Sequence, residues 1–385
     1  MTPGIDPRLR GHMPSLDGVR GLAILLILLL HFVANMQATN GLERLVMRTL
    51  DFGILGVDLF FVLSGFLITG ILVDSKGSDG FFQNFYARRT LRIFPLYYAV
   101  LFILIVVLPR IPPFAGPELD FLRAEQAWAW FYGVNVFAAL RGALEMPYID
   151  HFWSLAVEEH FYLFWPLLVF ACSQKTLLKV SAGLSVGALA ARFAASFAHV
   201  NPVAIYVLTP YRLDALCIGG FLAVYARQPG GLDRLVRYAK PAAIVTLLLN
   251  ASTYAAVKIN HDVFDSVRQF RPTLFAMLFA LLIVAAIVSP PGTVVNRFFG
   301  PELRLLGKYS YGLYVFHHFF SYYFVHHRTE WVVTSWVGSH TLAVALQAIA
   351  GSVGAFGVAF ASYHLFEKRF LVLKRYWESR PRAAS

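Results

Sequence analysis

The stretch GLAILLILLL, which covers residues 21–30, decides the fold class of this chain. It contains no charged or polar side chain, and runs of the same kind recur at residues 99–108, 161–171 and 274–288. An α-helix that crosses a lipid bilayer needs about 20 mostly apolar residues. Runs of this kind along the whole chain predict an all-α protein, a polytopic bundle of transmembrane helices.

The overall composition supports the same conclusion. Of the 385 residues, 58% are hydrophobic and 14% are charged, whereas an ordinary soluble domain carries about 25% charged residues. So few charges cannot cover the surface of a soluble protein. The arginines before the first apolar run also fit a signal peptide, but no small-residue cleavage site follows and the run contains His31. We therefore expect this run to remain as a span.

The apolar runs predict about ten spans in one membrane domain, residues 1–385, with no appended soluble domain. The expected spans are residues 16–36, 53–73, 92–109, 152–172, 179–198, 211–226, 241–257, 273–289, 309–327 and 339–364. Polar or basic loops flank them, which is typical of a multi-pass protein of the cell membrane.

Residues 127–140 do not fit this series, because they are apolar and contain two tryptophans but are too short for a span. If they crossed the bilayer, the basic loops around Lys175 and Arg234 would face outside, although such loops usually stay in the cytoplasm. We therefore expect one short re-entrant or interfacial helix near 127–140 and cytoplasmic positions for both termini. The same loops explain the net charge of +11, so nucleic acid is not an expected partner.

The chain has two cysteines, Cys172 and Cys217, which lie in or beside apolar runs. Their separation does not match the spacing of metal ligands. We expect packing roles for both, without a disulfide or a metal site.

Charged residues at membrane depth are costly, so each marks a candidate functional site. Arg20 and His31 lie eleven positions apart, about three helical turns, so they share one helix face with roughly 16 Å between them. Arg20 would then lie near the cytoplasmic surface and His31 in the outer half of the span. The alternative is an arginine that snorkels at a helix end and a histidine bonded to a neighbouring helix.

Three acidic residues are expected at the depth of His31, namely Asp58, Glu158 and Glu159. A buried imidazole beside a carboxylate keeps one tautomer and accepts a proton from a hydroxyl, as general-base catalysis requires. Arg212 and Asp214 are expected near the same cluster, either as a mutual ion pair of structural use or as contacts to a substrate.

On the opposite side, Arg88, Arg89 and Arg92 open the third span. Arginines grouped at a membrane boundary are a common topology anchor, and they also make a good clamp for phosphate groups. A phosphorylated donor inside and a base toward the outside would suit an enzyme that works across the bilayer.

Five segments resemble, in the same order, the motifs of the acyltransferase family 3 membrane enzymes. They are LDGVRG at 16–21 followed by His31, GVDLFFVLSGFLI at 56–68, RTLRIFP at 89–95, WSLAVEEHFY at 153–162 and SYGLYVFH at 310–317. The resemblance runs from residue 15 to about residue 370, which is nearly the whole chain.

The resemblance implies transfer of an acyl group, usually acetyl from acetyl-CoA on the cytoplasmic side. The acceptor would be a hydroxyl of a glycan or another molecule outside or in the membrane. Some members carry an extra hydrolase-like domain after the membrane region, whereas this chain ends soon after its last expected span. We therefore expect direct transfer to the acceptor, or a separate partner protein that completes it.

By motif position, the resemblance gives His31 as the catalytic histidine and Arg20 as its motif partner. The residues expected to bind the donor phosphates are Arg89 and Arg92, with help from Arg88. Either Glu158 or Glu159 is expected to orient His31 or the acceptor. His31 would either deprotonate the acceptor hydroxyl or take the acyl group itself before passing it on.

Further polar residues are expected to line the tunnel or to contact the acceptor, namely Ser64, Arg212, Tyr311, Tyr314 and His317. The hydroxyls among them are candidate donors to the thioester oxygen, although most Ser and Tyr in spans only pack or bond between helices. His317 either lines the tunnel or is a satisfied core histidine. His326 is expected to be a solvated loop residue.

The expected partners are acyl-CoA as a co-substrate, a glycan or lipid-linked acceptor and the lipid bilayer, with a homodimer as a further expectation. No cofactor is expected. The alternative function is a transporter or flippase of a glycan or lipid-linked intermediate, which also buries charges along a path. The sequence shows neither inverted repeats nor paired Gly/Pro-broken spans, which favours the enzyme.

Overall fold

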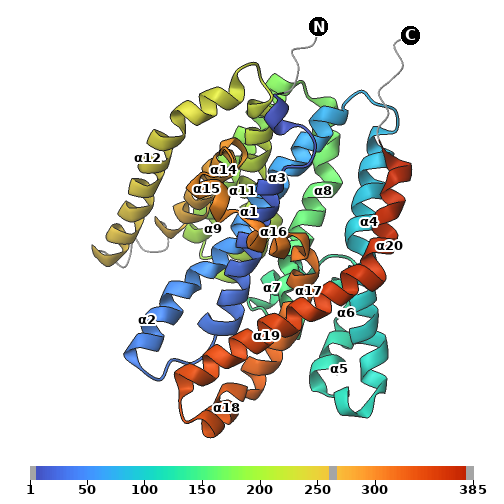
Figure 1. Cartoon of the computed structure of the whole chain (residues 1–385), viewed down its shortest axis with the longest axis vertical. Helices are drawn as coiled ribbons and strands as arrows, with labels where there is room; N and C mark the ends of the chain where they lie inside the picture. The colour runs from blue at the N-terminus through green and yellow to red at the C-terminus, as the bar shows by residue number, and fades with distance from the viewer. Residues whose placement is uncertain (1–5, 260–266, 379–385) are drawn as a thin grey trace.

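The computed structural model describes residues 6–259 and 267–378. Within these ranges the chain is helical and contains no β-strand. Long helices lie side by side in an elongated bundle, and α19 (His340–Ser362) crosses it obliquely toward α4 (Phe81–Phe102) and α20 (Lys368–Val372) at one edge (Figure 1). The all-α architecture expected from the sequence is thus confirmed.

Each of the ten expected spans falls largely within one helix. Besides α4 and α19, these helices are α1 (Pro14–Leu29), α3 (Leu55–Ser75), α8 (Trp153–Ala171), α9 (Gln174–Phe197), α11 (Thr209–Ala226), α12 (Gly231–Ile259), α14 (Phe270–Val288) and α17 (Ser310–His327). Among the described residues, 7 helices are long and apolar enough to cross a membrane. A polytopic architecture is therefore supported, while the count of ten spans stays a prediction.

Shorter helices connect or extend the long ones. They are η1 (Pro7–Leu9), η2 (Leu30–Ala34), α2 (Gly41–Leu50), η3 (Asp51–Ile54), η4 (Ile103–Val107), η5 (Leu108–Arg110), η6 (Pro112–Phe114), α5 (Pro117–Ala124), α6 (Gln126–Trp130), α7 (Val134–Arg141), η7 (Asp150–Phe152), α10 (Pro202–Val207), α15 (Val294–Phe298), α16 (Pro301–Lys308), α18 (Thr329–Val337), η9 (Tyr363–Glu367) and η10 (Leu373–Trp377). Side-chain caps fix where two of the long helices begin. The Ser173 hydroxyl accepts a hydrogen bond from the amide of Thr176 at the start of α9, and the Ser339 hydroxyl accepts one from the amide of Leu342 at the start of α19.

Large apolar side chains cover the outside of the bundle as well as its core. On α8, Phe164 is 61% exposed while its neighbour Trp165 is 2% exposed. Leu248 on α12 and Val353 on α19 are also exposed. An apolar exterior of this kind suits hydrocarbon rather than water as the surrounding solvent.

Close helix crossings fix the position of α1. A Cβ added at Gly21 would lie 1.8 Å from the carbonyl oxygen of Leu303 on α16, and one at Gly307 would lie 1.8 Å from that of Asp17. Only glycine permits backbones to approach this closely, as in many membrane helix pairs. The crossing holds the first turns of α1, including Arg20, against α16.

The C-terminal end of α1 widens into the π-helical turn η2, which contains His31. The amide of Asn35 bonds to the carbonyl of Leu30 at 3.1 Å, one residue further back than in an α-helix. Single π-turns of this kind are frequent at functional sites. The wide turn places His31 and Asn35 near each other on the helix.

The expectation of one short helix near 127–140 is corrected, because two helices, α6 and α7, share this segment. Between them Tyr132 adopts a left-handed backbone with φ of 55°. Its ring stacks on Tyr97 of α4 with 4.2 Å between centroids, and the amide of Gly133 bonds to the carbonyl of Trp128. The aromatic contact to α4 and the turn at Gly133 break the helix that apolarity alone suggests.

Candidate active site

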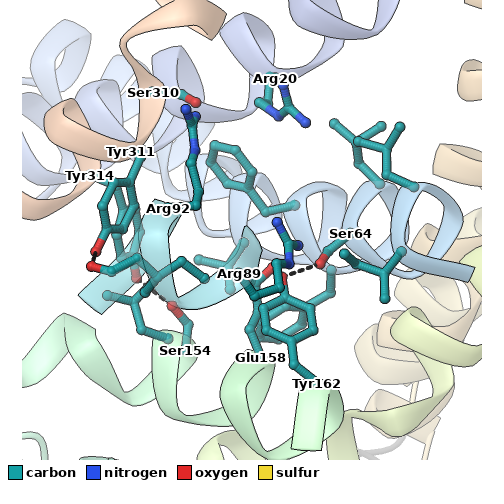
Figure 2. A pocket seen from close by; sticks show the side chains of 18 of the residues that line it. Arg20, Ser64, Arg89, Arg92, Ser154, Glu158, Tyr162, Ser310, Tyr311 and Tyr314 are labelled. Atoms are coloured by element: carbon teal, nitrogen blue, oxygen red, sulfur yellow. Dashed lines mark hydrogen bonds between the residues drawn. The ribbon is translucent and has the colours of Figure 1, made fainter. Parts of the chain in front are cut away.

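A cavity of about 250 Å³ opens between α1, α3, α4, α8 and α17. Figure 2 shows its labelled polar side chains, namely Arg20, Ser64, Arg89, Arg92, Ser154, Glu158, Tyr162, Ser310, Tyr311 and Tyr314. Residues from Val57 to Ile71 of α3 line it, which corresponds to roughly 20 Å along that helix. We call this elongated space the arginine cavity.

Cations gather at one end of the arginine cavity. Arg20 lies beside Asp17 at 3.0 Å, and the Arg89 guanidinium lies 4.3 Å above the ring centroid of Tyr162. Arg92 projects into the same space (Figure 2). Half-buried arginines that project into a cavity are suited to bind an anionic ligand such as phosphate.

The C-terminal segment adds a cation that sequence reasoning missed. Lys374 of η10 is half-buried and within electrostatic reach of Arg92, Arg89 and Arg20, because η10 packs on α4. Arg88, the expected helper, is exposed and is not among the residues that line the cavity. Of the three arginines expected to bind the donor, Arg89 and Arg92 line the cavity, together with Arg20, and Lys374 lies near them.

The middle of the cavity is polar on one wall. The hydroxyls of Ser64 and Tyr162 share a hydrogen bond of 2.5 Å, and Glu158 lies beside both (Figure 2). Glu159 does not line the cavity, and its buried Oε1 has no hydrogen-bond partner among the described residues. Of the two expected glutamates, Glu158 is the one that faces the cavity.

The far end of the cavity is closed by Ser154 of α8 and Tyr314 of α17. The Tyr314 hydroxyl donates to the carbonyl of His151 at 2.7 Å and shares a second bond with the Ser154 hydroxyl. The Ser154 hydroxyl lies 3.4 Å from the same carbonyl, so the two hydroxyls and the carbonyl form one hydrogen-bonded group. The Tyr311 hydroxyl is likewise committed, to the carbonyl of Ile93 at 2.7 Å.

Behind this wall lies a cluster of four histidines. The ring of His31 packs edge-on against His317 and His318, with centroids 4.9 and 5.2 Å away. His151 stacks on His318 at 4.6 Å. His151, His317 and His318 are buried, whereas His31 is half-buried, so His31 is the accessible member of the group.

Hydrogen bonds fix which nitrogen of His31 is basic. Its Nδ1 lies 3.0 Å from the carbonyl of Ile27, so Nδ1 carries the hydrogen and Nε2 keeps a lone pair. His317 is held in the same way, with Nδ1 2.8 Å from the carbonyl of Tyr314, and its buried Nε2 has no partner among the described residues. Two neutral imidazoles therefore offer free Nε2 lone pairs in one cluster.

The carboxylate that faces this cluster is Asp150, the first residue of η7 just before α8. Its Oδ1 lies 3.2 Å from Nε2 of His318, and its charge acts on His31. Burial raises the pKa of the Asp150 carboxyl to about 6. Neither Asp150 nor His318 lies in one of the five sequence motifs. The signal that could have indicated His318 is its position next to His317 in the same span.

Asp58, expected beside His31, is paired elsewhere. It is bonded to Arg212 of α11, and both side chains are buried. Asp214 is in turn bonded to Arg192 of α9 at 2.8 Å. The expected mutual ion pair of Arg212 and Asp214 is therefore corrected. Each side chain faces a neighbouring helix and bonds to a charged residue there.

These two ion pairs join α3, α9 and α11 around a separate cavity of about 250 Å³, which Arg192 and Arg212 line. Each of the two buried cations has a carboxylate partner, and this pairing offsets the free-energy cost of burying the charges. We assign them a structural role.

A metal site was not expected from the sequence, yet Asp150, His151 and His318 place ligand atoms within 4.8 Å of one another. The rings of His151 and His318 are stacked, with 28° between their planes. Their in-plane lone pairs therefore run side by side instead of converging on one point. This arrangement suits hydrogen bonding better than coordination of an ion.

The fold is a helical membrane bundle, and its arginine cavity leads to a histidine cluster. These features are typical of a membrane-embedded enzyme that transfers a chemical group. The chain matches the family model of the Acyl_transf_3 acyltransferase domain over residues 13–364. It therefore belongs to the acyltransferase family 3, as the sequence motifs indicated. No solved structure matches it.

The relatives that this chain resembles are named as O-acetyltransferases, two of them as peptidoglycan O-acetyltransferases. The chain is 30% identical over 335 residues to peptidoglycan O-acetyltransferase OatA of Listeria monocytogenes, covering 80% of this chain and 49% of the relative. It is 29% identical over 324 residues to putative peptidoglycan O-acetyltransferase YrhL of Bacillus subtilis, covering 80% and 48%. O-acetyltransferase OatA of Staphylococcus aureus is equally similar, at 29%. The chain spans about half the length of these relatives.

With the family and the apolar helices together, the chain is a multi-pass protein of the cell membrane.

Proposed function

We propose that this protein transfers an acyl group, most simply acetyl, from acyl-CoA to a hydroxyl of a glycan, with His31 as the base. The observation that carries the proposal is the arginine cavity, which runs from a cluster of cations to the wall of the histidine cluster. The similarity to peptidoglycan O-acetyltransferases supports acetyl transfer to a glycan.

The cavity suits acyl-CoA as the donor. This molecule has phosphates at its nucleotide end and a thioester at the end of a long flexible arm. Arg20, Arg89, Arg92 and Lys374 would hold the phosphates, and the roughly 20 Å of cavity along α3 would take the arm. The acyl group would then reach Tyr314 and the histidines while the nucleotide stays at the bundle end.

In the proposed reaction, Nε2 of His31 accepts the proton of the acceptor hydroxyl as its oxygen attacks the thioester carbonyl. The C–S bond then breaks, and the thiolate takes the proton from the imidazolium. The products are the acyl ester and free CoA, with His31 neutral again. The alternative sequence, in which Nε2 itself becomes acylated and passes the group on, uses the same lone pair.

The tetrahedral intermediate needs hydrogen-bond donors. Among the three hydroxyls expected for this role, those of Tyr311 and Tyr314 donate to backbone carbonyls. The Ser64 hydroxyl is bonded to side chains instead, sharing a hydrogen bond with the Tyr162 hydroxyl and lying beside the Glu158 carboxyl. Ser64 is thus the best placed of the three to turn its hydrogen toward a bound thioester.

The orientation of the chain follows from its charges. The cation cluster and the basic loops would face the cytoplasm, where basic loops are retained and acyl-CoA is made. Both termini would then be cytoplasmic, and the histidine cluster would lie toward the outer face.

The test uses purified protein in lipid nanodiscs with acetyl-CoA labelled in the acetyl group and chitotriose as the glycan. The proposal predicts one ester on the glycan for each CoA thiol released, and loss of both with His31→Gln. Wild-type protein that binds acetyl-CoA but forms no ester would overturn it. Movement of the glycan across a sealed vesicle without ester formation would instead favour the transporter.

A further inference from the structure

A second cavity, of about 210 Å³, reaches the histidine cluster at His318. It is lined by Asn35, Asp150, His318, Ser321, Tyr322, Val325 and His326. His326, expected to be a loop residue, lies in the last turn of α17. We call this space the polar cavity.

One layer of side chains separates the two cavities. Tyr314, at the closed end of the arginine cavity, bonds to the carbonyl of His151. The ring of His151 stacks on His318, which lines the polar cavity. The half-buried His31 packs against His318, and Asn35 follows one turn later on the same helix. His31 lines neither cavity itself, but it packs against His317 and His318 of this dividing layer.

The lining of the polar cavity is rich in hydrogen-bonding groups. Among the described residues that line it, Val325 alone is aliphatic. Asp150 accepts hydrogen bonds, Asn35 both donates and accepts, and Ser321 offers a hydroxyl. Such a set matches the alternating donors and acceptors of a polyhydroxylated ring.

Tyr322 gives the cavity an aromatic wall. Its ring contacts the ring of Tyr148, at 4.6 Å between centroids, and that of His326, at 5.5 Å and parallel within 8°. His326 is held in turn by Glu118 at 3.2 Å. A rigid aromatic face with its negative quadrupole attracts the weakly positive C–H face of a sugar ring.

The charge of the lining excludes some ligands. No arginine or lysine is among the described residues that line the cavity, and Asp150 contributes a negative charge. A phosphate or carboxylate would be repelled there, whereas the arginine cavity attracts them. The polar cavity thus selects a neutral group.

We propose that the polar cavity binds a neutral sugar ring of the acceptor, which stacks on Tyr322 and bonds to Asp150 and Asn35, with a free hydroxyl directed at His31. This inference rests on the proposed function for the role of the hydroxyl, but the sugar site itself does not require turnover. Acidic groups of the acceptor lie outside this cavity.

The test measures equilibrium binding of tritiated chitotriose to the full chain in nanodiscs, without donor. Tyr322→Ala is expected to weaken binding about tenfold, as loss of one aromatic partner does, while Tyr322→Phe keeps the ring and binds like wild type. The matched control is Tyr323→Ala, because Tyr323 is 51% exposed and packs on His327 instead. Retained acetyl-CoA binding shows that each variant is folded.

The outcomes separate this inference from the proposed function. Wild-type affinity in Tyr322→Ala, or no binding of chitotriose to wild-type protein, overturns the sugar site. Tyr322-dependent binding without any ester from acetyl-CoA leaves the sugar site standing and refutes the proposed function. Ester formation with an acceptor KM that rises about tenfold in Tyr322→Ala, at unchanged donor KM, supports both.

Discussion

The ring of His31 packs edge-on against the ring of His317, with 4.9 Å between their centroids. They belong to spans at opposite ends of the sequence, yet each uses Nδ1 to bond a carbonyl of its own helix. Both Nε2 atoms are therefore free to meet a ligand. Because the rings are so close, protonation of one disfavours protonation of the other, so the cluster is suited to hold one proton at a time.

Arg92→Ala should raise the donor KM by about 10- to 100-fold, since a charge-assisted bond to phosphate is worth about 1.5–3 kcal/mol. Lys374→Ala should raise it less, because a single half-buried ammonium is a weaker phosphate contact. Arg88→Ala is the matched control, as Arg88 is exposed and outside the cavity lining. Steady-state kinetics with varied acetyl-CoA decide the matter. Equal effects of all three substitutions would contradict the assignment of the cavity.

Asp150 predicts a pH dependence of acceptor binding. Burial raises its carboxyl pKa to about 6, so the carboxylate that accepts a sugar hydrogen bond is present above that pH and is lost below it. The groups that face it are His31, His151, His318 and Tyr322. The acceptor KM should rise as the pH falls through about 6.

The control for that experiment is Asp150→Asn, which cannot ionise. Its acceptor KM should be raised at every pH and should lack the step seen in the wild type. If the same step persists in Asp150→Asn, another group is responsible.

Gly307→Ala should destabilise the protein, because the new methyl group would lie 1.8 Å from the carbonyl of Asp17. Forcing α16 away from α1 should cost about 1–3 kcal/mol or more, as overpacking does, and should lower the thermal transition in detergent by several degrees. Gly187→Ala on α9 is the control, since its Cβ would meet nothing within 4 Å. A transition unchanged by Gly307→Ala would mean that the two helices are less tightly packed.

The two chemical routes at His31 predict different trapped species. Rapid quenching after mixing with labelled acetyl-CoA alone should leave acid-labile label on the protein if Nε2 is acylated. Direct transfer predicts no such label during full turnover. His317→Ala tests whether Nε2 of His317 carries the acyl group instead. Loss of the label in this variant would assign the acylated nitrogen to His317.

The sequence was sufficient for the helical membrane class and for most of the arginine cavity. Apolar runs reveal spans by themselves, and the motifs single out Arg20, Arg89 and Arg92. These arginines lie inside α1 and α4 rather than at helix ends, and the contact of Arg89 with Tyr162 of α8 could not be predicted from the sequence. Lys374 was missed because its approach depends on how η10 packs on α4.

The histidine cluster could be predicted only in part. His31 and His317 were visible from the motifs, but the expected carboxylates were the wrong partners. The depth of a residue along a span does not show which way its side chain faces around the helix. Asp58 therefore pairs with Arg212, and the carboxylate beside His318 is that of Asp150. The prediction of one helix near 127–140 was wrong for a similar reason, because the contact of Tyr132 with Tyr97 breaks the helix.

The most direct test of the account is the rate of acyl transfer in a single turnover, with donor and acceptor both saturating, for wild type and His31→Gln. The account predicts that His31→Gln binds acetyl-CoA with wild-type affinity, because His31 does not line the arginine cavity. Its transfer rate should nevertheless fall by about 10²- to 10⁴-fold, the usual contribution of a general base. Transfer by His31→Gln at the wild-type rate would contradict the central claim.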